Sequence, residues 1–167
     1  MRFRHWHLST LLAVATLGAA VQADAAWLDN RYYMGSECVP VGYTSQGSSI
    51  VSAGGIRNGG TTTQGYYCPL RHYTSSYWTD DIAVYVLDRH YSEDAWCQVR
   101  AANPYGLSYS YTSKKYTSGS DTLAQKLSFG YFNSGNAWWY VACELPGTYS
   151  GSASAIHAYY SQDIDRG

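Results

Sequence analysis

The sequence predicts an all-β protein, an antiparallel β-sandwich of jelly-roll or immunoglobulin-like type. Tyr (18 residues) and Gly (16 residues) are abundant, while charged residues make up only 14% of the 167-residue chain. Strands favour aromatic residues, and the turns between them favour Gly. Short segments in which apolar and polar residues alternate recur along the chain, whereas helical periodicity is nearly absent. The aromatic content also argues against disorder, because disordered chains are rich in charge.

The first 25 residues have the pattern of a cleaved signal peptide. Arg2 and Arg4 precede an apolar stretch, residues 11–21, that is too short to span a bilayer comfortably. Small residues at positions 23 and 25 favour cleavage before Ala26, and an uncleaved N-terminal anchor is the alternative. We therefore expect a single domain over residues 26–167, secreted or periplasmic, without a membrane span in the mature chain.

The first predicted strands cover residues 48–53 and 62–70. They fall in or beside a segment rich in Gly, Ser and Thr, residues 44–65, in which Asn58-Gly59-Gly60 is the turn signal. A linker has a similar composition. Because the segment lies between Cys38 and Cys68, however, a tethered loop or a twisted edge strand is the better interpretation.

The clearest strand covers residues 81–89, where one face carries Ile82, Val84 and Val86. A polar cluster, residues 90–94, then turns the chain into a strand over residues 95–101. In that second strand the apolar positions again alternate with polar ones. The two segments predict a β-hairpin with a loop of about five residues.

The C-terminal part contains one strong predicted strand, residues 137–145, which Pro146-Gly147 ends. Its alternation assigns Trp139 to the core and places Trp138 and Tyr140 outside. Three weaker strands cover residues 107–112, 122–129 and 153–160. Their turn signals are Asn103-Pro104 and Ser134-Gly135-Asn136.

The cysteines predict two disulfides, because an even number in an exported chain is typical of a disulfide framework. Cys38, Cys68, Cys97 and Cys143 allow three connectivities. Sequential pairing, Cys38–Cys68 and Cys97–Cys143, is preferred since each pair then belongs to one half of the chain. Cys97 and Cys143 are expected to point inward and to bond across the sandwich. A zinc site is the alternative, but no CxxC or HxxxH spacing supports it.

Several segments together resemble a largely uncharacterised group of small exported bacterial proteins, over residues 36–165. These segments are Cys68-Pro69-Leu70, Val84-Tyr85-Val86-Leu87-Asp88-Arg89, Cys97 followed by Asn103-Pro104-Tyr105-Gly106, Leu127-Ser128-Phe129-Gly130, Tyr140-Val141-Ala142-Cys143-Glu144-Leu145-Pro146 and Ala155-Ile156-His157-Ala158-Tyr159-Tyr160. The resemblance implies a two-disulfide β-sandwich and carries over no catalytic residue. The pair Trp138-Trp139 departs from the pattern of that group.

Charge and motif content weigh against several functions. With 11 Lys and Arg against 12 Asp and Glu, the chain lacks the basic face that nucleic-acid binding requires. His90 between Asp88 and Ser92 suggests a catalytic triad, but no nucleophile elbow or oxyanion loop accompanies it, and a solvated turn is the preferred interpretation. We therefore expect no enzymatic activity.

Acidic residues at positions 80, 81, 88, 93 and 94 supply oxygen ligands that Ca²⁺ accepts. They lack the DxDxDG spacing of a calcium loop, and nothing sets two of them at the separation that glycoside hydrolysis requires. We therefore expect no cofactor, with Ca²⁺ as the alternative.

Aromatic residues on outward faces are the strongest indication of function. Tyr85, Trp96, Trp138 and Tyr140 form one surface patch if their strands are neighbours. Flat rings stack on sugars or on the apolar surface of a partner. A second core-facing layer is the alternative interpretation of the same positions.

These observations favour a secreted, non-catalytic binding or structural protein whose partner is a glycan or an extracellular protein. A stand-alone carbohydrate-binding module that uses Tyr85, Trp96, Trp138 and Tyr140 is the first alternative. A small secreted hydrolase is the second. An enzyme inhibitor that presents an exposed loop, residues 112–120, is the third.

Overall fold

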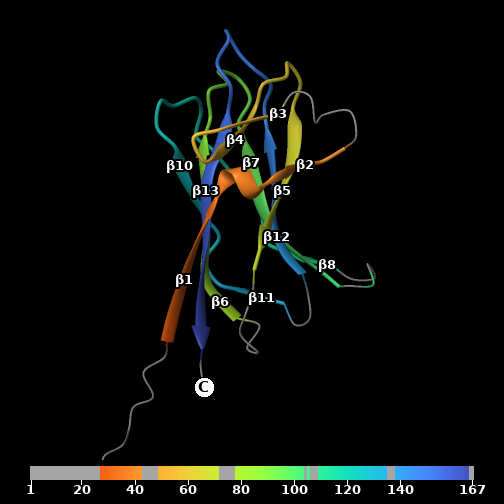
Figure 1. Cartoon of the computed structure of the whole chain (residues 1–167), viewed down its shortest axis with the longest axis vertical. Helices are drawn as coiled ribbons and strands as arrows, with labels where there is room; N and C mark the ends of the chain where they lie inside the picture. The colour runs from red at the N-terminus through yellow and green to blue at the C-terminus, as the bar shows by residue number, and fades with distance from the viewer. Residues whose placement is uncertain are drawn as a thin grey trace, which may run out of the picture.

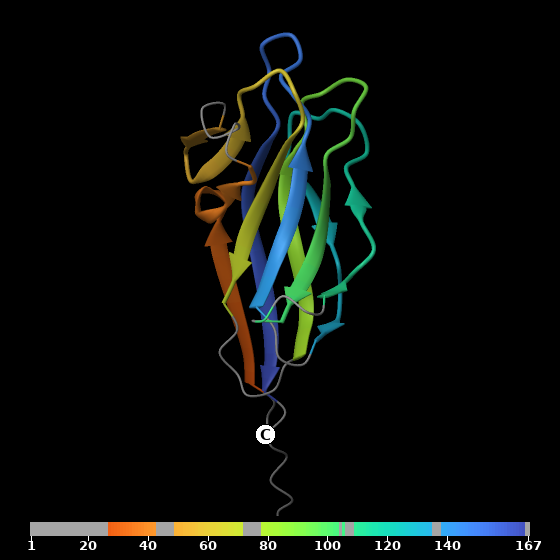
Figure 2. The same cartoon turned by 90° about the vertical axis from the view of Figure 1, so that its right-hand side faces the viewer.

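The computed structural model describes residues 27–42, 49–71, 78–103, 105, 109–134 and 138–165. The expected signal peptide and parts of the turns at positions 104 and 135–136 lie outside these residues. The described chain forms two antiparallel sheets, which we call sheet A and sheet B (Figures 1 and 2). Within the described ranges, no helix is both long and apolar enough to cross a bilayer.

Sheet A has the strand order β10-β6-β13-β4-β3, with β1 added beside β13 and β11 beside β6. Its strands are β1 (Trp27–Met34), β3 (Ser49–Ser52), β4 (Gly55–Asn58), β6 (Trp78–Leu87), β10 (Gln125–Ser128), β11 (Phe132–Asn133) and β13 (Ala155–Asp165). The first and last strands, β1 and β13, pair from Trp27 opposite Asp165 to Met34 opposite Ala158.

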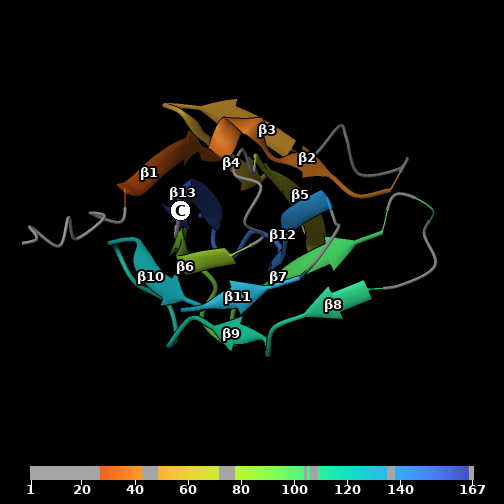
Figure 3. The ribbon, with the colours of Figure 1, turned by 90° about the horizontal axis from the view of Figure 1, so that it is seen from below.

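Sheet B has the strand order β2-β5-β12-β7-β8, with β9 beside β7. Its strands are β2 (Val39–Pro40), β5 (Gln64–Leu70), β7 (Trp96–Ala102), β8 (Tyr109–Tyr111), β9 (Lys115–Tyr116) and β12 (Trp138–Leu145). One turn of 3₁₀ helix, η1 (Gly35–Glu37), follows β1 and leads to β2. Figure 3 shows the strands from below, with β6 and β13 in one layer and β5, β12 and β7 in the other. The antiparallel β-sandwich that the sequence predicts is confirmed.

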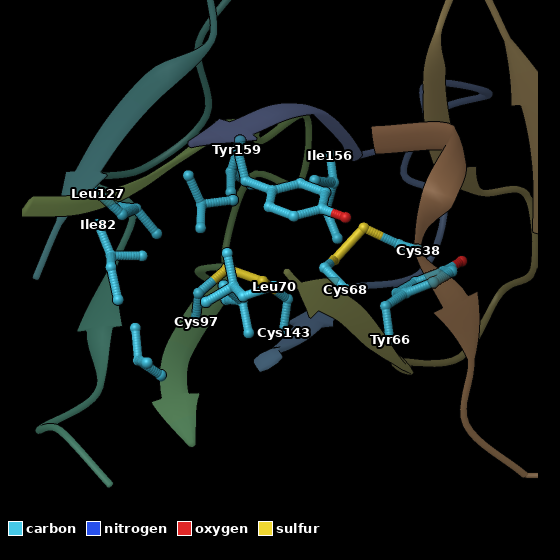
Figure 4. Close-up of a cluster of buried hydrophobic side chains, with 14 of the residues drawn as sticks. Cys38, Tyr66, Cys68, Leu70, Ile82, Cys97, Leu127, Cys143, Ile156 and Tyr159 are labelled. Atoms are coloured by element: carbon cyan, nitrogen blue, oxygen red, sulfur yellow. A yellow bond between two sulfur atoms is a disulfide. The ribbon is translucent and has the colours of Figure 1, made fainter. Parts of the chain in front are cut away.

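On β6 and β12, the alternation separates the large core side chains from the surface side chains as predicted. Ile82, Val84 and Val86 of β6 are fully buried. On β12, Trp139 is 4% exposed whereas Trp138 is 73% exposed. The inner faces of both sheets meet in a single apolar core (Figure 4). Burial of apolar surface on one face of each sheet is the main force that holds the two layers together.

The predicted hairpin over residues 81–101 is wrong, because β6 belongs to sheet A and β7 to sheet B. The buried Asp88 directs the chain from one sheet to the other. Its carboxylate accepts the N–H groups of His90 and Ala95, each at 2.9 Å, and the hydroxyls of Thr117 and Ser154. These bonds stabilise the bend after β6 that carries the chain away from sheet A.

The sequential disulfide pairing is confirmed, with bonds Cys38–Cys68 and Cys97–Cys143 (Figure 4). The expectation that Cys97 and Cys143 bond across the sandwich is wrong. They lie directly opposite each other on the neighbouring strands β7 and β12, with their Cα atoms 4.0 Å apart. Cys38 precedes β2 and joins it to β5. Both bonds therefore brace sheet B.

Two buried tyrosines link the sheets instead. The Tyr159 hydroxyl on β13 donates to the Pro69 carbonyl on β5 at 3.0 Å, and the Tyr33 hydroxyl on β1 donates to the Arg71 carbonyl at 3.0 Å. The two rings stack with their centroids 4.8 Å apart. Burial raises the pKa of Tyr159 well above its ordinary value, so its hydroxyl remains a donor through the neutral range.

Candidate functional site

The four aromatic residues predicted as one patch are divided between the two sheets. Trp96, Trp138 and Tyr140 lie on the outer face of sheet B, whereas Tyr85 lies on β6 in sheet A. The prediction of a single patch is wrong, because β6 pairs with β10, β11 and β13 and has no partner in sheet B.

Trp96 has its own intramolecular partners. Its indole N–H donates to a carboxylate oxygen of Glu144 at 3.0 Å. The ammonium group of Lys114 lies 3.5 Å from the centre of the ring and covers one face of it. Trp96 is therefore held against sheet B and does not offer that face for stacking.

Tyr140 lies in a groove that crosses the outer face of sheet B. The groove has a volume of about 490 Å³ and is lined by Tyr67, Gln98, Arg100, Tyr111 and Tyr140. Its residues come from the neighbouring strands β5, β12, β7 and β8, of which β5, β12 and β7 run side by side in Figure 2. The volume is within the range of about 300–1,000 Å³ that is usual for ligand sites.

The register of the strands explains why these side chains meet. Tyr140 is opposite Arg100, which is opposite Tyr111 on the next strand. Two residues further along β12, on the same face, Ala142 lies between Tyr67 and Gln98. Because its side chain is small, it leaves a depression between those two larger side chains. The rings of Tyr67 and Tyr140 contact each other across the strands, with centroids 4.9 Å apart.

Tyr111 and Trp138 extend the aromatic surface beyond the groove floor. Tyr111 is 68% exposed and Trp138 is 73% exposed, so much of each ring faces solvent. Trp138 precedes Tyr140 by two residues on β12 and shares its face, at a spacing of about 7 Å along the strand.

No protein-family model matches the chain, and no curated protein matches it either. Solved structures do match. A low-affinity xylan-binding module, CBM86, from the gut symbiont Roseburia intestinalis superposes with a TM-score of 0.52 and 7% identity, over 82% of this chain and 96% of that one. A CBM36-1 domain of a multidomain xylanase, from the hindgut metagenome of Trinervitermes trinervoides, gives a TM-score of 0.47 and 14% identity, over 81% of this chain and 97% of that one. At such identities the first match shows a shared β-sandwich fold and no more.

Four lining residues of the groove, Tyr67, Gln98, Arg100 and Tyr111, were absent from the predicted patch. Tyr67 immediately precedes Cys68 and Arg100 is three residues beyond Cys97, so both alternate out of phase with a buried cysteine. This phase relation assigns Tyr67 and Arg100 to the outer face from sequence alone. That they meet depends on the pairing of β12 with both β5 and β7, which the sequence does not specify.

Tyr85 belongs to a separate cluster on the outer face of sheet A. The ring of Tyr160 lies between those of Tyr85 and Tyr32, at 6.4 and 5.6 Å. The Tyr160 hydroxyl donates to Asp81 and accepts from the Lys126 ammonium at 2.9 Å. Asp81 is thus engaged by its neighbours on this face.

The charged groups of that cluster shift one another's pKa values. Burial alone would raise the pKa of Asp81, but hydrogen bonds from Tyr160 and Ser128 and the charge of Lys126 outweigh it and lower that pKa. The hydrogen bond to Tyr160 raises the pKa of Lys126, and burial raises that of Tyr160. The charge pattern of this face is therefore constant through the neutral range.

Three of the residues considered for a triad or a calcium loop, Asp88, His90 and Asp94, have structural partners. Asp88 binds backbone amides and hydroxyls at the bend, while the Nδ1 atom of His90 accepts the N–H groups of Ser92 and Glu93 at 3.4 and 3.0 Å. The Asp94 carboxylate accepts the N–H of Gly119 at 3.0 Å. In the described part of the chain, no three His, Cys, Asp or Glu side chains converge as metal ligands would.

The segment considered as an inhibitory loop, residues 112–120, follows the edge of sheet B. Lys115 and Tyr116 pair with β7 as strand β9, and the N–H groups of Thr112 and Thr117 donate to Val99 and Ala95. The segment thus contains a two-residue edge strand with exposed side chains, whereas Thr117 is buried and bonds to Asp88. Among the positions that the sequence singled out, the groove around Tyr140 has the geometry of a ligand site.

Proposed function

We propose that the protein is a secreted, non-catalytic glycan-binding module that holds its ligand in the groove of sheet B. The observation that carries this proposal is the row of tyrosines and polar side chains across β5, β12, β7 and β8. Sugar rings have an apolar face that packs on Tyr and hydroxyl edges that hydrogen-bond to Gln and Arg.

The fold is compatible with this function and suggests which ligand to test first. The module from Roseburia intestinalis that shares the fold binds xylan with low affinity. A β-sandwich also offers a rigid platform for the groove. Most groove residues project from strands that a disulfide braces, namely Tyr67 on β5, Gln98 and Arg100 on β7, and Tyr140 on β12. Tyr111 projects from β8, which pairs with β7. Rigid rings lose little conformational entropy when a ligand binds.

The two disulfides support a location outside the cytoplasm. Structural disulfides form and persist in oxidising compartments and are rare in reducing ones. A glycan-binding module outside the cytoplasm would have direct access to polysaccharides, which agrees with the export that the N-terminal sequence predicts.

Binding to a glycan array, followed by titration calorimetry with xylan oligosaccharides, tests the proposal. Y140A removes the central ring of the groove, and we expect it to weaken binding about tenfold or more. The matched control is Y32A, which removes a 74% exposed tyrosine on the outer face of sheet A. Failure to bind any glycan, or an equal loss for Y140A and Y32A, would contradict the proposal.

A further inference from the structure

Arg100 is the charged residue in a groove that otherwise consists of tyrosines and a glutamine. It projects from β7 between Tyr140 on β12 and Tyr111 on β8. Its side chain is half-buried, and the residues opposite it on the two neighbouring strands are both tyrosines. A cation at the centre of an aromatic groove favours ligands that combine a sugar face with a negative charge.

Gln98 holds the guanidinium in one orientation. The Nε atom of Arg100 donates to the Gln98 side-chain oxygen at 2.9 Å, and the Gln98 amide donates to the Thr112 carbonyl at 2.7 Å. Gln98 is itself only 8% exposed. A guanidinium carries five N–H donors. With Nε engaged, the edge formed by the two Nη groups remains, and within the described residues it has no hydrogen-bond partner.

Among the described residues, no negative charge at the groove compensates Arg100. No described acidic side chain forms an ion pair with it, and none lines the groove. Glu144, on the same face of β12, is four residues from Tyr140, about 13 Å along the strand, and it accepts the indole N–H of Trp96. A guanidinium edge that has no acidic partner among the described residues matches a carboxylate in a bidentate pair.

We infer that the groove selects glycans that carry a carboxylate, such as chains containing uronic acids. The Nη edge of Arg100 binds the carboxylate, while Tyr140 and its neighbours pack against the sugar rings. This inference rests on the proposed glycan binding and deepens it, because it assigns the ligand's charge. Neutral stretches of polysaccharide then bind through the rings alone and more weakly.

A matched ligand pair tests this inference directly: an oligogalacturonide and its fully methyl-esterified form, each titrated into the purified protein with both disulfides formed. The two ligands differ in charge and share their sugar rings. We expect the acid to bind at least about tenfold tighter than the ester at low salt. The preference should shrink as the salt concentration rises.

Three variants distinguish a specific Arg100–carboxylate pair from a general electrostatic attraction between the protein and the acidic ligand. R100M should abolish the preference for the acid. R100K keeps the positive charge but lacks the planar guanidinium that binds a carboxylate through two hydrogen bonds, so it should retain only part of the preference. K114M is the matched control, because it removes a cation that lies over Trp96 and outside the groove lining, and it should keep the preference. Circular dichroism of each variant checks that the sandwich is intact.

The outcomes distinguish the inference from the function on which it rests. Equal binding of acid and ester, or an equal loss of preference in K114M and R100M, would overturn the inference and leave glycan binding in place. Absence of binding to every glycan, acid or neutral, would remove both.

Discussion

Asn58 illustrates how one buried polar side chain joins the two sheets. It is fully buried at the end of β4, and its amide nitrogen lies 3.1 Å from the Leu145 carbonyl and 3.0 Å from that of Pro146, beyond β12. Its Oδ1 atom accepts the N–H of Gly60 at 3.0 Å. A buried polar group costs free energy unless it is hydrogen-bonded. The turn signal that begins at Asn58 therefore also marks a link between sheet A and sheet B.

The lowered pKa of Asp81 predicts how the stability of the fold depends on pH. Its pKa is lowered in the folded protein, so its contribution to the free energy of unfolding is present above the unfolded value of about 3.9. That contribution is lost as the pH falls through the lower, folded pKa. D81N removes the titrating group, so the difference in Tm between wild type and D81N should be largest near pH 6 and shrink below pH 4. Thermal unfolding followed between about pH 3 and pH 7 measures this, and a difference that stays constant would contradict it.

At the scale of strands, alternation predicted burial well and pairing poorly. The inward positions of β6 and β12 are buried as expected. Successive side chains of a strand point alternately toward the core and toward solvent, whichever strands are its neighbours. The partner of a strand depends on where the intervening loop leads. Residues 90–94 have the composition of a hairpin loop, yet Asp88 binds Thr117 and Ser154 from distant segments and directs the chain to the other sheet.

Because alternation does not reveal strand pairing, it predicted only some of the residues at the candidate site. Outward positions such as Trp138 and Tyr140 follow from the phase of β12. Whether Tyr85 or Tyr67 is a neighbour of Tyr140 depends on sheet order, and only Tyr67 is. Long-range strand order is set by the packing of the whole core, so a local pattern does not reveal it.

The 3₁₀ turn η1 provides a test of packing between elements. Gly35 is buried against β13, and a Cβ atom at this position would lie 1.9 Å from the Ile156 carbonyl oxygen. G35A should therefore displace η1 from sheet A and lower the free energy of unfolding by about 1–3 kcal/mol. Denaturant unfolding measures the change, and S36A at the adjacent, partly exposed position is the control. Equal stability of G35A and wild type would show that η1 does not pack in this way.

In the molecule as a whole, the many tyrosines occupy two kinds of position. Exposed rings cover the outer faces, while Tyr33 and Tyr159 lie in the core and direct their hydroxyls to carbonyl groups of the opposite layer. Tyrosine suits this second position because its ring adds apolar burial and its hydroxyl satisfies a backbone acceptor. The contact between the layers is therefore polar as well as hydrophobic.

Y159F measures the contribution of that link between the layers. The variant keeps the ring and removes the hydrogen bond to Pro69, so we expect the free energy of unfolding to fall by about 1 kcal/mol. Urea unfolding gives the value, and Y105F, at a tyrosine that is 82% exposed, should have no measurable effect. If Y159F were as stable as Y105F, the hydroxyl would not contribute to holding the sheets together.

The antiparallel pairing of β1 with β13 determines how the domain responds to mechanical load. Trp27 lies opposite Asp165, so the described chain enters and leaves the sandwich at one pole (Figure 1). Tension between these two ends would open β1 from β13 one residue pair at a time, because the hydrogen bonds of an antiparallel pair run across the strands. The pulling force would not pass first through β7 and β12, which the Cys97–Cys143 bond also holds covalently. The groove of sheet B would thus keep its shape while the opposite sheet begins to unzip.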